Sequence, residues 1–113
     1  MKKEAFVTKE QVEKIAAEYP TPFYLYDEAG IRKNAENVKK AFSWNKGFRE
    51  YFAVKATPNP SLVGIMKDYG FGTDCSSMTE LMTSRALGFP GECIMFSSND
   101  TPAEEYTYAN KIG

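Results

Sequence analysis

The feature that most constrains the fold of this chain is a pattern that repeats three times from residue 49 onward. In each repeat a short apolar run leads through a turn into an amphipathic helical segment, and one repeat takes roughly 20 residues. The apolar runs predict strands at 49–54, 72–75 and 92–96. Strands that alternate with helices favour a parallel sheet, because each helix returns the chain to the edge where the previous strand began. The expected fold class is therefore α/β.

Helix-start signals follow each apolar run. Asn59 stands directly before a proline, an arrangement that is common where helices begin. Ser77 with Glu80, and Thr101 with Glu104, have the spacing of a capping box, in which two side chains satisfy each other's backbone amides. These signals predict a helix after each of the three strands.

Two further helices are predicted before the repeats. Residues 8–11 form another capping box, and Asp27 is placed to cap a second helix whose apolar face includes Ile31 and Ala35. Between these helices the apolar run 23–26 predicts an additional strand. The predicted order is helix, strand and helix, followed by three strand–helix units.

Polar residues stand where the predicted strands end. Lys55 follows the first strand of the repeats, Asp74 lies near the end of the second, and the polar segment 97–99 follows the third. The C-terminal ends of parallel strands meet at one edge of the sheet, and α/β folds place their chemistry at this edge. We therefore expect these residues to form a functional rim.

Lys55 carries the most specific chemical signal of the rim. A lysine amine that lies against apolar walls loses solvation, which favours its neutral, nucleophilic form. Such an amine suits a Schiff base with an aldehyde cofactor. The competing interpretation is a solvated loop lysine, which is common after a strand, and the position of Lys55 alone does not separate the two.

Composition narrows the function classes. The 113 residues contain no histidine, which excludes Ser-His-Asp catalysis, Cys-His catalysis and histidine-based metal sites within this chain. Cys75 and Cys93 lack the spacing of a metal or redox motif, so we predict free thiols, no metal and a cytoplasmic setting. Because 14 basic and 15 acidic residues are well mixed, neither nucleic acid nor a membrane is an expected partner.

Four segments in this order resemble the pyridoxal-phosphate (PLP) decarboxylases of the alanine racemase-like barrel group, and diaminopimelate decarboxylase most of all. Ornithine and arginine decarboxylases are relatives within this group. The segments are 21–27, 51–60, 72–80 and 94–99, so the resemblance covers nearly the whole chain from residue 21. One departure is Thr79, where diaminopimelate decarboxylases usually carry glycine and where the sequence reads closer to the ornithine decarboxylase form.

The resemblance implies the N-terminal part of a (β/α)8 TIM barrel of the PLP-binding type, incomplete in this chain. Residues 1–26 would pack with a missing C-terminal β domain, and residues 27–113 would form the first strand–helix units of the barrel. The full-length protein would be a homodimer. The 113-residue piece alone is expected to be inactive.

The resemblance also implies roles for three residues. Lys55 would carry pyridoxal 5'-phosphate as a Schiff base, Asp74 would lie beside this lysine and the substrate, and Glu80 would lie near the site. Local structure offers alternatives, because Asp74 could simply cap turn amides and Glu80 is the last residue of a capping box.

The implied activity is decarboxylation of an amino acid, with meso-diaminopimelate giving L-lysine in lysine biosynthesis as the first choice. The alternatives are an ornithine- or arginine-type decarboxylase, or a PLP-binding barrel protein without decarboxylase activity. A racemase and an α/β piece without a ligand also stay open. Nucleotide binding is disfavoured, because Gly70-Phe71-Gly72 lacks the third glycine and the following helix of a dinucleotide motif.

Overall fold

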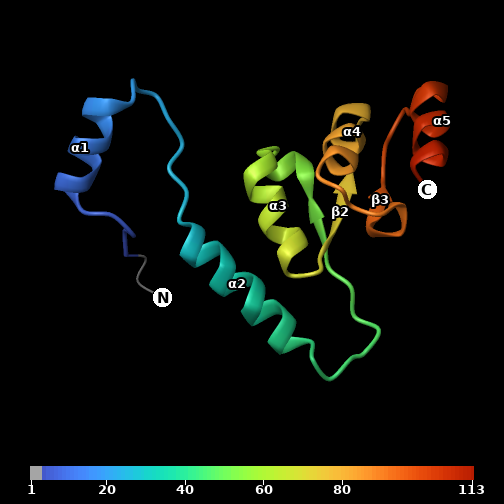
Figure 1. The fold of residues 1–113 in the computed structure, drawn as a ribbon, viewed down its shortest axis with the longest axis horizontal. Helices are drawn as coiled ribbons and strands as arrows, with labels where there is room; N and C mark the ends of the chain where they lie inside the picture. The colour runs from blue at the N-terminus through green and yellow to red at the C-terminus, as the bar shows by residue number, and fades with distance from the viewer. Residues whose placement is uncertain (1–3) are drawn as a thin grey trace.

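A computed structural model describes residues 4–113 and confirms the predicted parallel α/β architecture. Three parallel strands form one sheet in the order β1-β2-β3, and a helix follows each strand (Figure 1). The strands are β1 (Tyr51–Ala53), β2 (Gly72–Cys75) and β3 (Ile94–Phe96). The helices are α1 (Lys9–Glu18), α2 (Glu28–Ala41), α3 (Pro60–Asp68), α4 (Met78–Ala86) and α5 (Ala103–Ile112), with short 3-10 turns η1 (Val54–Ala56) and η2 (Gly91–Cys93).

The two faces of the sheet have different surroundings. Thr73 pairs with Phe52 on one side and Ile94 on the other, and this row faces the helices, with Thr73 fully buried. The next row contains Asp74 and Met95, and the side chain of Met95 is 48% exposed. Because successive side chains of a strand point to opposite faces, the row of Asp74 lies on the face away from the helices. Within residues 4–113 this second face is open.

The helix-covered face holds the core. Its fully buried members are Val54, Val63, Cys75, Leu81 and Phe89, which come from the ends of strands, from α3 and α4, and from the turn after α4. Side chains of α5 pack against the same cluster. The strands are therefore anchored from one side by three helices, and their C-terminal ends are held in a fixed arrangement.

The helix starts follow the predicted chemistry at the beginning of the chain. At α1 the Thr8 side chain accepts from the Gln11 amide and the Gln11 side chain accepts from the Thr8 amide, a complete capping box. Asp27 caps α2, and Asn59 accepts from the Ser61 amide at 3.0 Å at the start of α3. These three predictions are confirmed.

Two predicted strands are shorter in the structure. The first ends at Ala53, because the chain then winds into η1, where the Thr57 amide donates to the Val54 carbonyl instead of continuing the ladder. The third begins at Ile94, because residues 91–93 form η2. Lys55 follows its strand, as predicted, and stands within the 3-10 turn η1.

The predicted strand at 23–26 is wrong for the described part of the chain. These residues are extended but pair with no strand among residues 4–113, and the side chain of Tyr24 is 88% exposed. A strand needs a hydrogen-bonded neighbour, and α1 also lies apart from the sheet without a buried residue (Figure 1). Within the same residues, no helix is both long and apolar enough to cross a membrane.

The capping box predicted at Thr101 is also wrong. The N-cap residue of α5 is Pro102, which makes no side-chain capping bond. Because the helix begins one residue later than predicted, its third residue is Glu105 rather than Glu104. The Glu105 carboxylate does not cap α5 and instead accepts a hydrogen bond from the backbone of α4.

Candidate active site

Lys55 lies at the C-terminal rim of the sheet, as its place in the sequence predicted. It follows Val54, which is 1% exposed, and the turn η1 that contains both residues contacts β2. Ala53, two residues before the lysine, is the ladder partner of Asp74. The sheet register thus brings the turn of Lys55 to the strand of Asp74. Lys55 itself is exposed, so the apolar walls predicted around its amine are not formed by the described residues.

Asp74 is half-buried and bonded to the neighbouring strand. The Ser97 hydroxyl donates to Oδ1 of Asp74 at 2.5 Å, and the Ser97 amide donates to the Cys75 carbonyl at 2.9 Å. No other described side chain donates to the Asp74 carboxylate, so Oδ2 stays available to a further partner at the rim. No amide of the described residues donates to the Asp74 carboxylate, so Asp74 lacks the bond expected of a residue that only caps its own turn.

Glu80 organises the turn between β2 and α4. Its carboxylate accepts from the Ser76 amide at 2.9 Å, from the Ser76 hydroxyl at 3.1 Å and from the Ser77 hydroxyl at 3.1 Å. The Ser77 hydroxyl in turn accepts from the Glu80 amide at 3.4 Å. The predicted capping box is therefore present in a modified form, with the carboxylate one residue further back. These contacts assign Glu80 to holding the turn that directly follows Asp74.

A second carboxylate reaches the same turn from a distant helix. Oε1 of Glu105 in α5 accepts from the backbone amide of Met78, the first residue of α4, at 3.0 Å. A bond between residues 27 apart in sequence leaves no local signal, and the predicted register of α5 pointed to Glu104 instead. Two glutamates thus fix the start of α4 beneath the rim.

Tyr51 closes the opposite end of the open sheet face. Its ring covers Gly72, where an added Cβ would lie 2.6 Å from a ring carbon, and its hydroxyl donates to the Glu92 carbonyl at 3.3 Å. Tyr51 thus reaches from β1 across Gly72 of β2 to the η2 turn before β3, on the face away from the helices. The glycine is required there because any side chain would displace the ring.

Cys75 belongs to the core rather than to the rim. Burial raises the pKa of its thiol above the usual value, and the negative charges of Glu80 and Asp74 act in the same direction. Hydrogen bonds with Ser84 and Thr73 oppose this shift without reversing it. A thiol that resists ionisation is a poor nucleophile, so Cys75 is a packing residue. Cys75 and Cys93 are both free thiols, as predicted.

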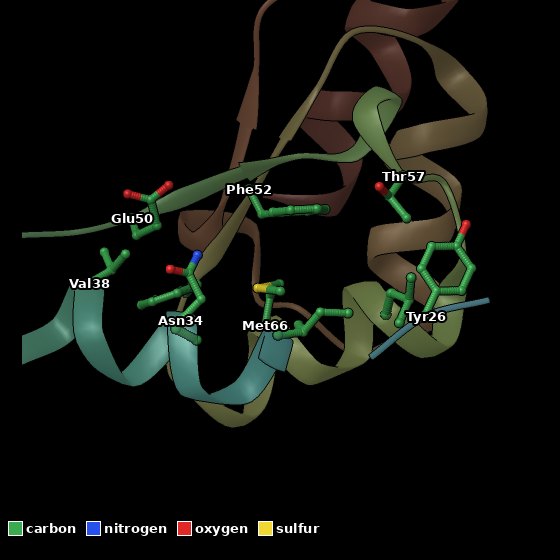
Figure 2. Close-up of a pocket in the computed structure, with 11 residues that line it drawn as sticks. Tyr26, Asn34, Val38, Glu50, Phe52, Thr57 and Met66 are labelled. Atoms are coloured by element: carbon green, nitrogen blue, oxygen red, sulfur yellow. The ribbon is translucent and has the colours of Figure 1, made fainter. Parts of the chain in front are cut away.

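A pocket of about 390 Å³ lies beside the sheet, away from the rim residues. It runs along β1 between α2 and α3, and Figure 2 shows Phe52 from the strand facing Met66 of α3 and Asn34 of α2. Its lining is mostly apolar, and Lys55, Asp74 and Glu80 are not part of it. The full lining is Tyr26, Ile31, Asn34, Ala35, Val38, Glu50, Phe52, Thr57, Leu62, Met66 and Phe71.

The rim residues fit the demands of an aldehyde cofactor. An exposed amine on a turn that is anchored by a buried valine is free to form a Schiff base, and the nearby carboxylate has one oxygen without a described donor. The small side chain of Ala53, in the same row as Asp74, leaves space above the open face.

Comparisons with known proteins agree with this chemistry. The pattern of the family described as "Pyridoxal-dependent decarboxylase, pyridoxal binding domain" matches residues 28–113. Protein TabA of Pseudomonas amygdali pv. tabaci is 46% identical over 95 residues, which are 84% of this chain and 22% of that protein. Diaminopimelate decarboxylase of Bacillus subtilis is 36% identical over 102 residues, which are 88% of this chain and 23% of that protein.

A solved structure gives the same fold. Ornithine decarboxylase from Entamoeba histolytica superposes with a TM-score of 0.78 at 31% identity, over 93% of this chain and 33% of that one. The chain thus spans less than a quarter of the curated relatives named above and a third of this structure. The prediction of the N-terminal part of a PLP-binding barrel is confirmed. From the family match and the shared fold together, the chain belongs to the pyridoxal-dependent decarboxylases, and its residues 28–113 match the pyridoxal binding domain of that family.

Proposed function

We propose that the full-length protein decarboxylates an amino acid with the help of PLP. The observation that carries the proposal is the placement of Lys55 in the turn after β1, two residues beyond the ladder partner of Asp74 and exposed at the rim. Family membership supplies the reaction class.

The three predicted site residues would then act in different ways. Lys55 would hold the cofactor through Nζ and, once displaced by a substrate amine, would move a proton at the same atom. Asp74 would hold the charge and the orientation of that amine. Bound PLP supplies an electron sink for the bond that breaks. Glu80, whose oxygens are occupied by Ser76 and Ser77, would keep the β2–α4 turn in place rather than meet the substrate.

For the substrate we propose meso-diaminopimelate, with L-lysine as the product. Support comes from diaminopimelate decarboxylases among the relatives at 31% to 37% identity. The specific observation in favour of the second candidate, an ornithine-type substrate, is Thr79 at the first turn of α4, together with the ornithine decarboxylase structure described above.

We also propose that residues 1–26 pack against a part of the protein outside this chain, of β structure. The support is that α1 buries no residue and that Tyr19 and Tyr24 are 60% and 88% exposed. Exposed aromatic side chains at the end of a helix and in an extended segment are typical of a surface that another domain covers. A homodimer and a cytoplasmic location remain part of the same proposal.

The test is carbon dioxide release by the full-length protein with PLP and a panel of meso-diaminopimelate, ornithine, arginine and lysine. We expect release from meso-diaminopimelate to be fastest, and Lys55→Ala to abolish it. Release that is fastest with ornithine would support the second candidate. Formation of a racemate without carbon dioxide, or no turnover of the panel by protein that binds PLP, would overturn the proposal. Residues 1–113 alone should give no turnover, because the sheet face beside Asp74 is open.

A further inference from the structure

Ser97 is held at the rim by two bonds that differ in kind. Its amide donates to the Cys75 carbonyl at 2.9 Å, which extends the β2–β3 ladder one residue beyond Phe96. Its hydroxyl donates to Oδ1 of Asp74 at 2.5 Å. The first bond fixes the backbone of the serine, so the hydroxyl has a defined position from which to orient the carboxylate.

Because side chains alternate between the two faces of a sheet, the side chains of Asp74 and Ser97 lie on the same, open face. Asp74 pairs with Met95, and Ser97 follows Met95 by two residues, so all three point away from the helices. Ser97 stands one step nearer to the C-terminal edge than Asp74. The serine therefore contacts the carboxylate from the side on which the turn of Lys55 and the expected cofactor lie.

We propose that Ser97 is a positioning residue that fixes the orientation of the Asp74 carboxylate and leaves Oδ2 directed to the amine of Lys55. This inference rests on the proposed function of the rim. A hydroxyl suits the task because it donates to a carboxylate without adding a competing charge, and a bond to an ionised acceptor is about twice as strong as a neutral one.

The chain offers a matched control in the next residue. Ser98 follows in the same loop, but its hydroxyl contacts the Asn99 carbonyl at 3.5 Å and no carboxylate. Ser97→Ala, Ser97→Thr and Ser98→Ala would be made in the full-length protein, each also in an Asp74→Asn background. The rate kcat and KM for the preferred amino acid are measured with PLP, and crystal structures without cofactor report the orientation of Asp74.

We expect Ser97→Ala to lower kcat by about tenfold with little change in KM, since the lost bond is made to a charged group. Ser97→Thr should restore most of the rate, because threonine keeps the hydroxyl. In the Asp74→Asn background the Ser97→Ala change should have little additional effect, and the crystal structure of Ser97→Ala should show Asp74 turned from its original position. Ser98→Ala should lower kcat less than Ser97→Ala does, and it should leave the orientation of Asp74 unchanged.

Equal effects of Ser97→Ala and Ser98→Ala on kcat, or an unchanged Asp74 orientation in Ser97→Ala, would overturn the inference. Full additivity with Asp74→Asn would do the same, because it would place the two residues in separate roles. The proposed function fails by a different result, namely full activity of Lys55→Ala. The two failures are therefore distinguishable in one set of proteins.

Discussion

The bond from Glu105 to the Met78 amide allows a quantitative test of how α5 holds the start of α4. Glu105→Ala removes the acceptor, and Glu104→Ala is the matched control because both residues lie in the first turn of α5 and Glu104 is exposed. Each change removes one negative charge from the N-terminus of α5, so the loss of favourable interaction with the helix dipole is shared. Of these two glutamates, only Glu105 accepts a hydrogen bond from α4 within the described residues.

The size of the effect follows from the contact. A backbone amide bonded to an ionised carboxylate contributes about 1.5–3 kcal/mol, and partial exposure to water reduces this contribution. Because Glu105 is part-buried with a 3.0 Å bond, we expect Glu105→Ala to destabilise α4 by about 1–2 kcal/mol more than Glu104→Ala does.

Replacing Met78 by proline tests the hydrogen bond between the Met78 amide and Glu105 by itself. Met78 is the first residue of α4, where proline is tolerated because its missing amide has no partner within the helix. Ser77 before it has φ −154° and ψ 163°, the extended conformation that a following proline requires. Met78→Pro thus removes the donor, and in this background Glu105→Ala should cost no more than Glu104→Ala.

The assay is hydrogen exchange of the α4 amides in the full-length protein under native conditions. A difference of 1.4 kcal/mol corresponds to about tenfold faster exchange. Equal exchange rates in Glu105→Ala and Glu104→Ala would contradict this role of Glu105. An excess effect of Glu105→Ala that persists unchanged in the Met78→Pro background would contradict it as well.

Two further predictions concern single positions in the described fold. Gly72→Ala should destabilise the protein strongly in thermal unfolding, since the added Cβ would lie 2.5 Å from the Cys93 carbonyl oxygen. Gly64→Ala in α3 should stabilise the protein by about 0.5–1 kcal/mol, because the added Cβ would have nothing within 4 Å. Equal effects of the two changes would contradict this prediction. Because burial raises the pKa of Cys75, native protein at pH 8 should react with iodoacetamide at Cys93 first. The contribution of the Cys75 thiol to the free energy of unfolding should be full below the ordinary thiol pKa of about 8.5. It should be lost as the pH rises through the higher pKa of the folded state. Cys75→Ala should flatten that alkaline decline, measured by urea unfolding, and a decline of unchanged slope would argue against the assignment.

Local chemistry made the repeats predictable from sequence. Asn59 before a proline, the Ser77 signal and the apolar runs each act over a few residues, so the helix starts and the parallel order follow from the sequence without knowledge of the packing. The rim position of Lys55 follows as well, because parallel strands share one C-terminal edge.

The contacts that hold the rim were not predictable in the same way. The bonds from Ser97 to Asp74 and from Glu105 to α4 join residues 23 and 27 apart, and they depend on strand register and on helix phase. A shift of one residue in the start of α5 exchanged the roles of two adjacent glutamates. The strand prediction at 23–26 was wrong for a related reason, since an apolar run forms a strand only where a partner strand is present.

Reduction with borohydride after addition of PLP to the full-length protein, followed by peptide mass mapping, shows which lysine holds the cofactor. We predict a pyridoxyl group on the peptide that contains Lys55, and no such group in the Lys55→Ala protein. A folded full-length protein that gives no adduct, or an adduct on another lysine that Lys55→Ala leaves unchanged, would contradict it.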